Sequence, residues 1–139
     1  MLSRAQIEGR LPHTGTMCLL DSVQRWDATT IVCHAAAPTA THPLTRAQGV
    51  PAVAAVEYAA QAAAVHGSLL DATDSPRDGL LAKLTDVELP ATLFDAGGGP
   101  LTVRAELLSR VDSGCLYAFE VSDHRSCVAR GRLLVAFQA

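Results

Sequence analysis

The chain has 139 residues, of which 49% are hydrophobic and 18% are charged, and its formal net charge is −3. This length suits one compact domain, 1–139, that is long enough to build a hydrophobic core. The weak acidic balance argues against nucleic acid or an anionic membrane as the main partner, because both require clustered Lys and Arg. No apolar run approaches the roughly 20 residues that span a bilayer.

The opening residues and the cysteines indicate the compartment. MLSRAQIEGR lacks the hydrophobic segment of a secretory signal, so we expect a cytoplasmic protein. The four cysteines are scattered without a CxxC pair, which favours small buried thiols over a disulfide framework. Neither the cysteines nor the five histidines show metal-ligand spacing, and we expect no metal and no cofactor.

Two strands and a helix are expected in the first half of the chain. The strands cover Met17–Trp26 and Thr30–Ala37, with a tight turn at Asp27-Ala28 between them. After a proline-containing loop, Pro51 stands where proline commonly precedes a helix. The helix is expected over Val53–Leu70, ending either at Gly67 or one turn later.

The second half is expected to form strands only. Alternating apolar character and hairpin-type turns predict four of them: Gly79–Pro90, Leu101–Val111, Cys115–Ser122 and Ser126–Phe137. Two strands, one apolar helix and four antiparallel strands indicate the α+β class. A curved antiparallel sheet wrapped around one long central helix satisfies this order.

A glutamate interrupts the apolar helix. Glu57 and Gln61 are its only strongly polar residues before His66, and their spacing of four places them on one face. A carboxylate in such surroundings needs a hydrogen bond, a counter-charge or a chemical role. The alternative is a solvated Glu at the helix rim. Gln61 either supports Glu57 or caps a carbonyl of the sheet.

Two blocks of sequence resemble a known family. LPH at 11–13 followed by MCLLDSV at 17–23 resembles the opening LPHxxxMxLLDxV of hot-dog-fold 3-hydroxyacyl-(acyl carrier protein) dehydratases. VPAVAAVEYAAQ at 50–61 resembles their helix start, MPGVLxxEAxAQ, with the Pro, Glu and Gln at matching distances. Within this superfamily the chain is most similar to the small dehydratases of aryl-polyene and related pigment gene clusters.

The resemblance implies a reaction and a set of roles. A histidine before the helix removes a proton alpha to the thioester, and the helix carboxylate of the facing subunit, here Glu57, protonates the departing hydroxyl. Imidazole suits the first task because it is neutral near pH 7. Pro51, Ala52, Val53 and Gln61 would then line the substrate site. N–H groups around Ala52 and Val53 could stabilise the thioester oxygen.

The chain departs from the family around the base. The family places its histidine in HFPG, 14 residues before the Glu, whereas His42 lies in HPLT, 15 residues before Glu57. Ala52 replaces the glycine whose backbone approaches the thioester in relatives. His13 of the LPH segment is the second candidate for the base. The choice between His42 and His13 stays open at this point. A third alternative is that neither histidine is the base.

The remaining histidines and the arginines receive structural interpretations. His66 lies nine positions after Glu57, too far to share a reacting centre, and is expected at the helix end or surface. His34 is expected in a strand, satisfied by a neighbour, and His124 in a solvent-facing turn. Five arginines near the C-terminal strands are expected at solvated sheet edges, or in contact with the phosphopantetheine phosphate or an acidic carrier protein: Arg104, Arg110, Arg125, Arg130 and Arg132.

Three functions follow from the resemblance. The first is dehydration of a 3-hydroxyacyl thioester on acyl carrier protein to the trans-2-enoyl thioester, in fatty acid or polyene biosynthesis, by a homodimer or by a heterodimer with a related dehydratase. The second is a hot-dog acyl thioesterase that uses the helix carboxylate. The third is an inactive partner subunit of an active dehydratase, which the altered HPLT segment and Ala52 favour.

Overall fold

The computed structural model describes residues 1–11, 18–38, 42–44, 46, 50–71, 79–90, 94 and 99–137, without the side chains of 79–82 and 137. The elements in chain order are β1 (Leu2–Ser3), α1 (Arg4–Glu8), β2 (Ser22–Trp26), β3 (Thr30–Ala35), a 3₁₀ turn (Ala52–Ala54), α2 (Ala55–Leu70), β4 (Gly79–Glu88), β5 (Leu101–Val111), β6 (Gly114–Ser122) and β7 (Cys127–Phe137).

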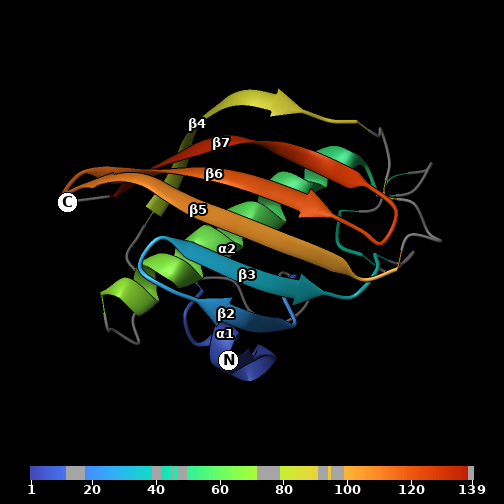
Figure 1. Cartoon of the computed structure of the whole chain (residues 1–139), viewed down its shortest axis with the longest axis horizontal. Helices are drawn as coiled ribbons and strands as arrows, with labels where there is room; N and C mark the ends of the chain where they lie inside the picture. Colours follow the sequence, from blue (N-terminus) through green and yellow to red (C-terminus); the bar gives the residue numbers. More distant parts are fainter. Residues whose placement is uncertain are drawn as a thin grey trace.

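The strands of the described residues form one seven-stranded sheet in the order β1-β2-β3-β5-β6-β7-β4. Every neighbouring pair is antiparallel. The sheet lies across α2, with β4 at one edge (Figure 1). The helix packs against β3, β5, β6 and β7. This is the α+β arrangement of a curved sheet around one long helix that the sequence predicts.

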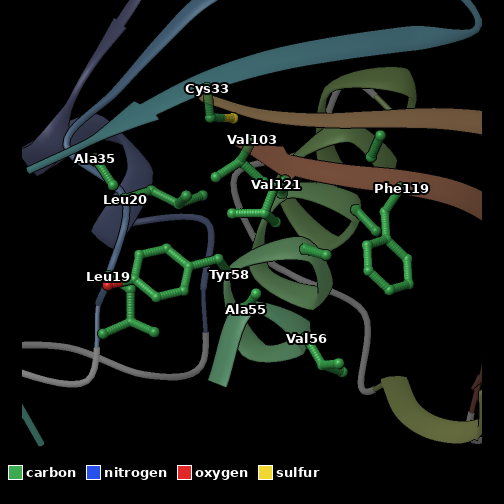
Figure 2. Close-up of a cluster of buried hydrophobic side chains, with 14 of the residues drawn as sticks. Leu19, Leu20, Cys33, Ala35, Ala55, Val56, Tyr58, Val103, Phe119 and Val121 are labelled. Atoms are coloured by element: carbon green, nitrogen blue, oxygen red, sulfur yellow. The ribbon is translucent and has the colours of Figure 1, made fainter. Parts of the chain in front are cut away.

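Small side chains let α2 approach the sheet closely. The buried residues of α2 include four alanines, Ala55, Ala59, Ala62 and Ala63, and Ala54 is buried on the preceding 3₁₀ turn. Opposite them, Cys33, Val103 and Val121 point from the sheet toward the helix (Figure 2). Because an apolar face of the sheet and an apolar helix cover each other, the core lies between these two layers.

The N-terminal residues form an element that the sequence pattern does not reveal. Ser3 caps α1: its Oγ accepts the Gln6 N–H, and the Gln6 Oε1 accepts the Ser3 N–H at 2.9 Å. Together these bonds make a capping box. Ile7 on this short helix is fully buried. The sequence predicts no element in these residues, but β1 and α1 pack onto the sheet margin through Ile7 and through the pairing of β1 with β2.

The other boundaries agree with the expectations to within a few residues. β5 has the expected bounds, and α2 continues past Gly67 to Leu70. β4 ends at Glu88, two residues before Pro90. β2 begins at Ser22 and not at Met17, which lies outside the described residues. Residues 18–20 lie outside the ladder, and their backbone groups bond to the side chains of Arg4 and Gln61.

The sheet is irregular along its edge strand. β4 shifts register against β7 twice, between Leu81 and Lys83 and between Thr85 and Glu88. Asp86 lies in the second shift with φ of 54°, a left-handed conformation that Asp tolerates better than most residues. Such bulges bend an edge strand and interrupt its pairing. No helix in the described part of the chain is long and apolar enough to cross a membrane.

Candidate functional site

Glu57 lies in the first turn of α2, with its side chain half-buried. One turn later, Gln61 is 3% exposed, and its Nε2 donates to Glu57 Oε1 at 3.1 Å. The Oε1 of Gln61 accepts the backbone N–H of Leu19 at 2.9 Å. Because that N–H can only donate, the amide of Gln61 has one orientation, with its NH₂ toward Glu57. The expected support of Glu57 by Gln61 is therefore present.

The segment that bonds Gln61 is itself fixed by charged groups. The Arg4 guanidinium donates to the carbonyl of Cys18 at 2.6 Å and to Asp21 Oδ1 at 3.0 Å. The other oxygen of Asp21 accepts the Ala36 N–H at 2.6 Å. Since Leu19 lies between these two anchor points, its N–H is held toward α2. Glu57 is thus connected, through Gln61 and residues 18–21, to the N-terminal helix.

The helix start lies beside this carboxylate. Pro51 has an extended conformation with ψ of 145°, and its carbonyl accepts the Ala54 N–H at 3.0 Å to close the 3₁₀ turn. Ala52 is fully buried, whereas Val53 is 54% exposed. The first N–H groups of a helix have no carbonyl partner within it and carry partial positive charge. The residues predicted to line the site therefore meet at one helix terminus.

His42 is bonded through both ring nitrogens. The Leu44 N–H donates to His42 Nδ1 at 3.0 Å, and His42 Nε2 lies 2.8 Å from the Tyr58 hydroxyl oxygen. A backbone N–H requires a lone pair, so Nδ1 is unprotonated and the neutral ring carries its hydrogen on Nε2. Burial lowers the pKa of His42 below its ordinary value, which favours this neutral form.

Tyr58 and Phe94 belong to this site, although the sequence gives no sign of them as site residues. The Tyr58 ring extends from α2 toward Leu19 and Leu20 (Figure 2) and is 2% exposed. It stacks on His42 at 5.8 Å and at 26°, and it meets the Phe94 ring at 5.8 Å on another side. Burial raises the pKa of Tyr58 to about 12, so its hydroxyl stays protonated.

Three of the four remaining histidines lie among the residues that the structure describes. His13 lies outside the described residues. His34 is half-buried in β3, and His124 is exposed in the turn before β7, as expected. The surface assignment of His66 is wrong: the ring is fully buried, with Nδ1 2.7 Å from the Tyr117 hydroxyl and Nε2 2.8 Å from the Asp27 carbonyl oxygen. These two partners satisfy the ring inside the core.

The C-terminal arginines in strands β5 and β7 differ in their surroundings. Arg104 and Arg130 are exposed, and they bond to Glu106 and Glu88 at 3.4 and 2.6 Å. Both belong to interior strands, β5 and β7, so the expectation of sheet edges is wrong for them, although the expected solvation is present. Arg110 pairs with Asp71 at the end of α2. Contact with an acidic carrier protein stays a prediction.

The described groups suit acid–base chemistry on a thioester. A hydrogen-bonded carboxyl, a neutral imidazole and a helix N-terminus provide a proton donor, a polar ring and a site for developing negative charge. Among the residues whose positions are described, no three His, Cys, Asp or Glu side chains are grouped so as to hold a metal ion. All four cysteines are free thiols, and Cys18, Cys33 and Cys115 are buried as expected.

Comparison with solved structures identifies the fold. A chain of "The Dehydratase Heterocomplex ApeI:P from Xenorhabdus doucetiae" has a TM-score of 0.84 and 21% identity over 100% of this chain and 93% of its own. A mutant thioesterase, SAV0944 from Staphylococcus aureus, has a TM-score of 0.62 and 16% identity, covering 85% of this chain and 93% of its own. A hypothetical thioesterase with coenzyme A from Streptococcus pneumoniae has a TM-score of 0.63 and 11% identity, with 85% coverage of both chains.

These likenesses confirm the hot-dog fold that the sequence resemblance implies. A search of curated proteins found no match. A protein-family model described as "ApeP dehydratase" matches residues 5–139, which is nearly the whole chain. The chain belongs to the ApeP-like dehydratase family.

Proposed function

We propose that this chain takes part in the dehydration of a 3-hydroxyacyl thioester, carried on acyl carrier protein, to the trans-2-enoyl thioester. The observation that carries the proposal is the half-buried carboxyl of Glu57, held by Gln61 next to the N-terminus of the buried helix. The family of the chain supports a dehydratase. Fatty acid or polyene biosynthesis is the setting that such a substrate implies.

The reaction needs one base, one acid and an oxyanion site. A neutral imidazole takes the proton alpha to the thioester, and the electron pair moves onto the thioester oxygen. The N–H groups at Ala52 and Val53 stabilise that oxygen. The electron pair then forms the carbon–carbon double bond as the bond from the beta carbon to the hydroxyl breaks. The carboxyl group of Glu57 donates a proton so that the hydroxyl leaves as water.

The proposal includes a second subunit. In this mechanism the imidazole and the carboxyl come from facing subunits, so the site is incomplete in one chain. The similar structure described as a dehydratase heterocomplex supports a heterodimer with a related dehydratase. A homodimer is the other arrangement. In the heterodimer the chain either shares in the active site through Glu57 or only stabilises the partner.

A thioesterase is the second candidate function, because several structures with this fold are described as thioesterases. A helix carboxylate can activate water or attack the thioester carbonyl directly. The products separate the two reactions. Dehydration keeps the acyl group on the carrier, whereas thioester hydrolysis releases a free acid and the carrier thiol.

The test uses purified protein with 3-hydroxyacyl carrier protein, alone and together with a related dehydratase, followed by intact-protein mass spectrometry. We expect the acyl carrier to lose one water, and Glu57→Gln to abolish most of that change. Release of free thiol without an enoyl product would select the thioesterase. A loss of water that is unchanged in Glu57→Gln and occurs only with the partner would select the stabilising subunit.

A further inference from the structure

His42, Tyr58 and Phe94, which we call the aromatic clamp, connect three separate parts of the chain at the start of α2. His42 belongs to residues 42–44, Tyr58 to the first turns of the helix, and Phe94 to a segment beyond β4. Tyr58 contacts both other rings, each at a centroid distance of 5.8 Å. The Phe94 N–H also donates to the Val50 carbonyl at 3.0 Å, directly before Pro51.

The hydrogen bonds of His42 leave no accessible lone pair on the ring. Nδ1 has a lone pair, but it faces the Leu44 N–H at 3.0 Å. Nε2 carries the hydrogen and donates it to the Tyr58 hydroxyl at 2.8 Å. The opposite tautomer would place Nδ1–H against the Leu44 N–H, so two donors would face each other. To accept a substrate proton, His42 would first have to break its bond with Leu44.

We propose that His42 is a positioning residue of the aromatic clamp, fixed as the Nε2–H tautomer, and that the proton acceptor for the substrate is a different imidazole. Its function is to hold residues 42–44 against Tyr58 and thereby to fix the helix start that presents Ala52 and Val53. This inference rests on the proposed dehydration, but its first test below needs no turnover. Of the two candidates for the base, His42 and His13, this inference excludes His42.

The Nε2–H tautomer of His42 can be observed directly. In ¹⁵N-labelled protein at neutral pH, we expect a pyridine-type shift for His42 Nδ1 and a pyrrole-type shift for Nε2, with His42→Gln providing the assignment. The reverse pattern, with the hydrogen on Nδ1, would overturn the proposal. Because this measurement uses the protein without substrate, its outcome is separate from that of the proposed function.

The role of His42 is tested by the pH–rate profile of the active assembly. A base gives the profile of kcat/KM an acidic limb, where its protonation removes activity. We expect His42→Gln, whose amide can donate to Tyr58, to keep that limb and to retain turnover within about tenfold of the wild type. Disappearance of the limb in this variant would show that His42 is the base.

Tyr58→Phe is the second variant, and it keeps the Leu44 bond while removing the acceptor for Nε2–H. It keeps the ring volume, so it is suited to a case in which His42→Gln does not fold. We expect the acidic limb to stay at the same pH and the turnover to fall moderately. If His42 were the base, losing its hydroxyl partner would move the limb, and that result would contradict the proposal.

Discussion

At the scale of single residues, the polar groups of α2 are explained by their partners. Gln61 is nearly completely buried, yet both ends of its amide are bonded, to Leu19 and to Glu57. Buried polar groups are tolerated in proteins when they are paired in this way. Gln61 therefore supports the carboxylate, as expected. Its other bond goes to the backbone N–H of Leu19 and not to a sheet carbonyl, which is the alternative that the sequence leaves open.

Gln61→Met is expected to destabilise the protein. The substitution keeps the length of the side chain but leaves the buried Leu19 N–H without its acceptor, at a cost of about 1–3 kcal/mol. Urea denaturation measures this free energy of unfolding. Ala64→Met is the matched control, because Ala64 is exposed on the same helix and its replacement should change stability by less than about 0.5 kcal/mol. Equal effects in the two variants would contradict the account.

His66 is expected to make folding sensitive to acid. Burial, the largest cause, lowers the pKa of His66, so the folded state favours the neutral ring while the unfolded state takes up a proton near pH 6.5. Stability is then complete above that pH and falls as the pH decreases below it. The neighbouring charged groups are Asp27 and Arg110, and their effects on this pKa oppose each other.

The measurement for His66 is the free energy of unfolding between pH 7.5 and 5. We expect the decrease toward acid pH to be smaller in His66→Gln than in the wild type. His124→Gln, at an exposed position, is the control and should leave the slope unchanged. An unaltered slope in His66→Gln would mean that the buried ring does not contribute to acid sensitivity.

At the scale of elements, two glycines with different surroundings give opposite predictions. A Cβ on Gly114, at the start of β6, would collide with the Val135 carbonyl oxygen of the neighbouring strand. Gly67, inside α2, has nothing within 4 Å of such a Cβ. Gly114→Ala is therefore expected to cost about 1–3 kcal/mol through overpacking.

Gly67→Ala is expected to stabilise the protein by about 0.5–1 kcal/mol, because alanine loses less backbone entropy than glycine in a helix. Thermal unfolding of both variants beside the wild type checks the two signs together. If the Gly114→Ala protein had the same melting temperature as the wild type, β6 and β7 would separate at this position at little cost in free energy. A destabilised Gly67→Ala protein would indicate an unseen neighbour of α2.

Element boundaries could be predicted where a local pattern sets them. β5 alternates between buried and more exposed residues from Leu101 to Glu106, and its bounds are as expected. α1 was missed because it has one buried residue, Ile7, and five residues are too few for a periodic signal. A signal was present in Ser3 and Gln6, whose spacing is that of a capping box. His66 was misplaced because its partner Tyr117 is 51 residues away.

At the scale of the whole molecule, the strand order is not determined by chain order. β4 follows the helix in sequence but pairs with β7, while β3 pairs with β5 across the intervening helix and strand. Such long-range choices depend on which edges remain to be paired, and local propensity does not encode them. The family resemblance implies the hot-dog fold but no strand order, and the residues alone indicate only a curved antiparallel sheet around one helix.

The residues of the candidate site that lie close together in sequence could be predicted, whereas those brought together by the fold could not. Pro51, Ala52, Val53, Glu57 and Gln61 lie within 11 positions of one another, so a single helix start brings them together. The partners of His42 could not be predicted, because Leu44 acts through its backbone and Tyr58 stands next to Glu57 on a neighbouring face. Phe94 reaches the site only through the fold.

The central claim is that Glu57 donates the proton to the departing hydroxyl, and a single-turnover measurement of Glu57→Gln tests it most directly. Glutamine keeps the shape and can still accept from Gln61 Nε2, so the assembly should form normally. With 3-hydroxyacyl carrier protein and the active assembly, we predict that the dehydration rate falls by about 10²–10⁴-fold. A Glu57→Gln assembly that dehydrates its substrate at the wild-type rate would contradict the account.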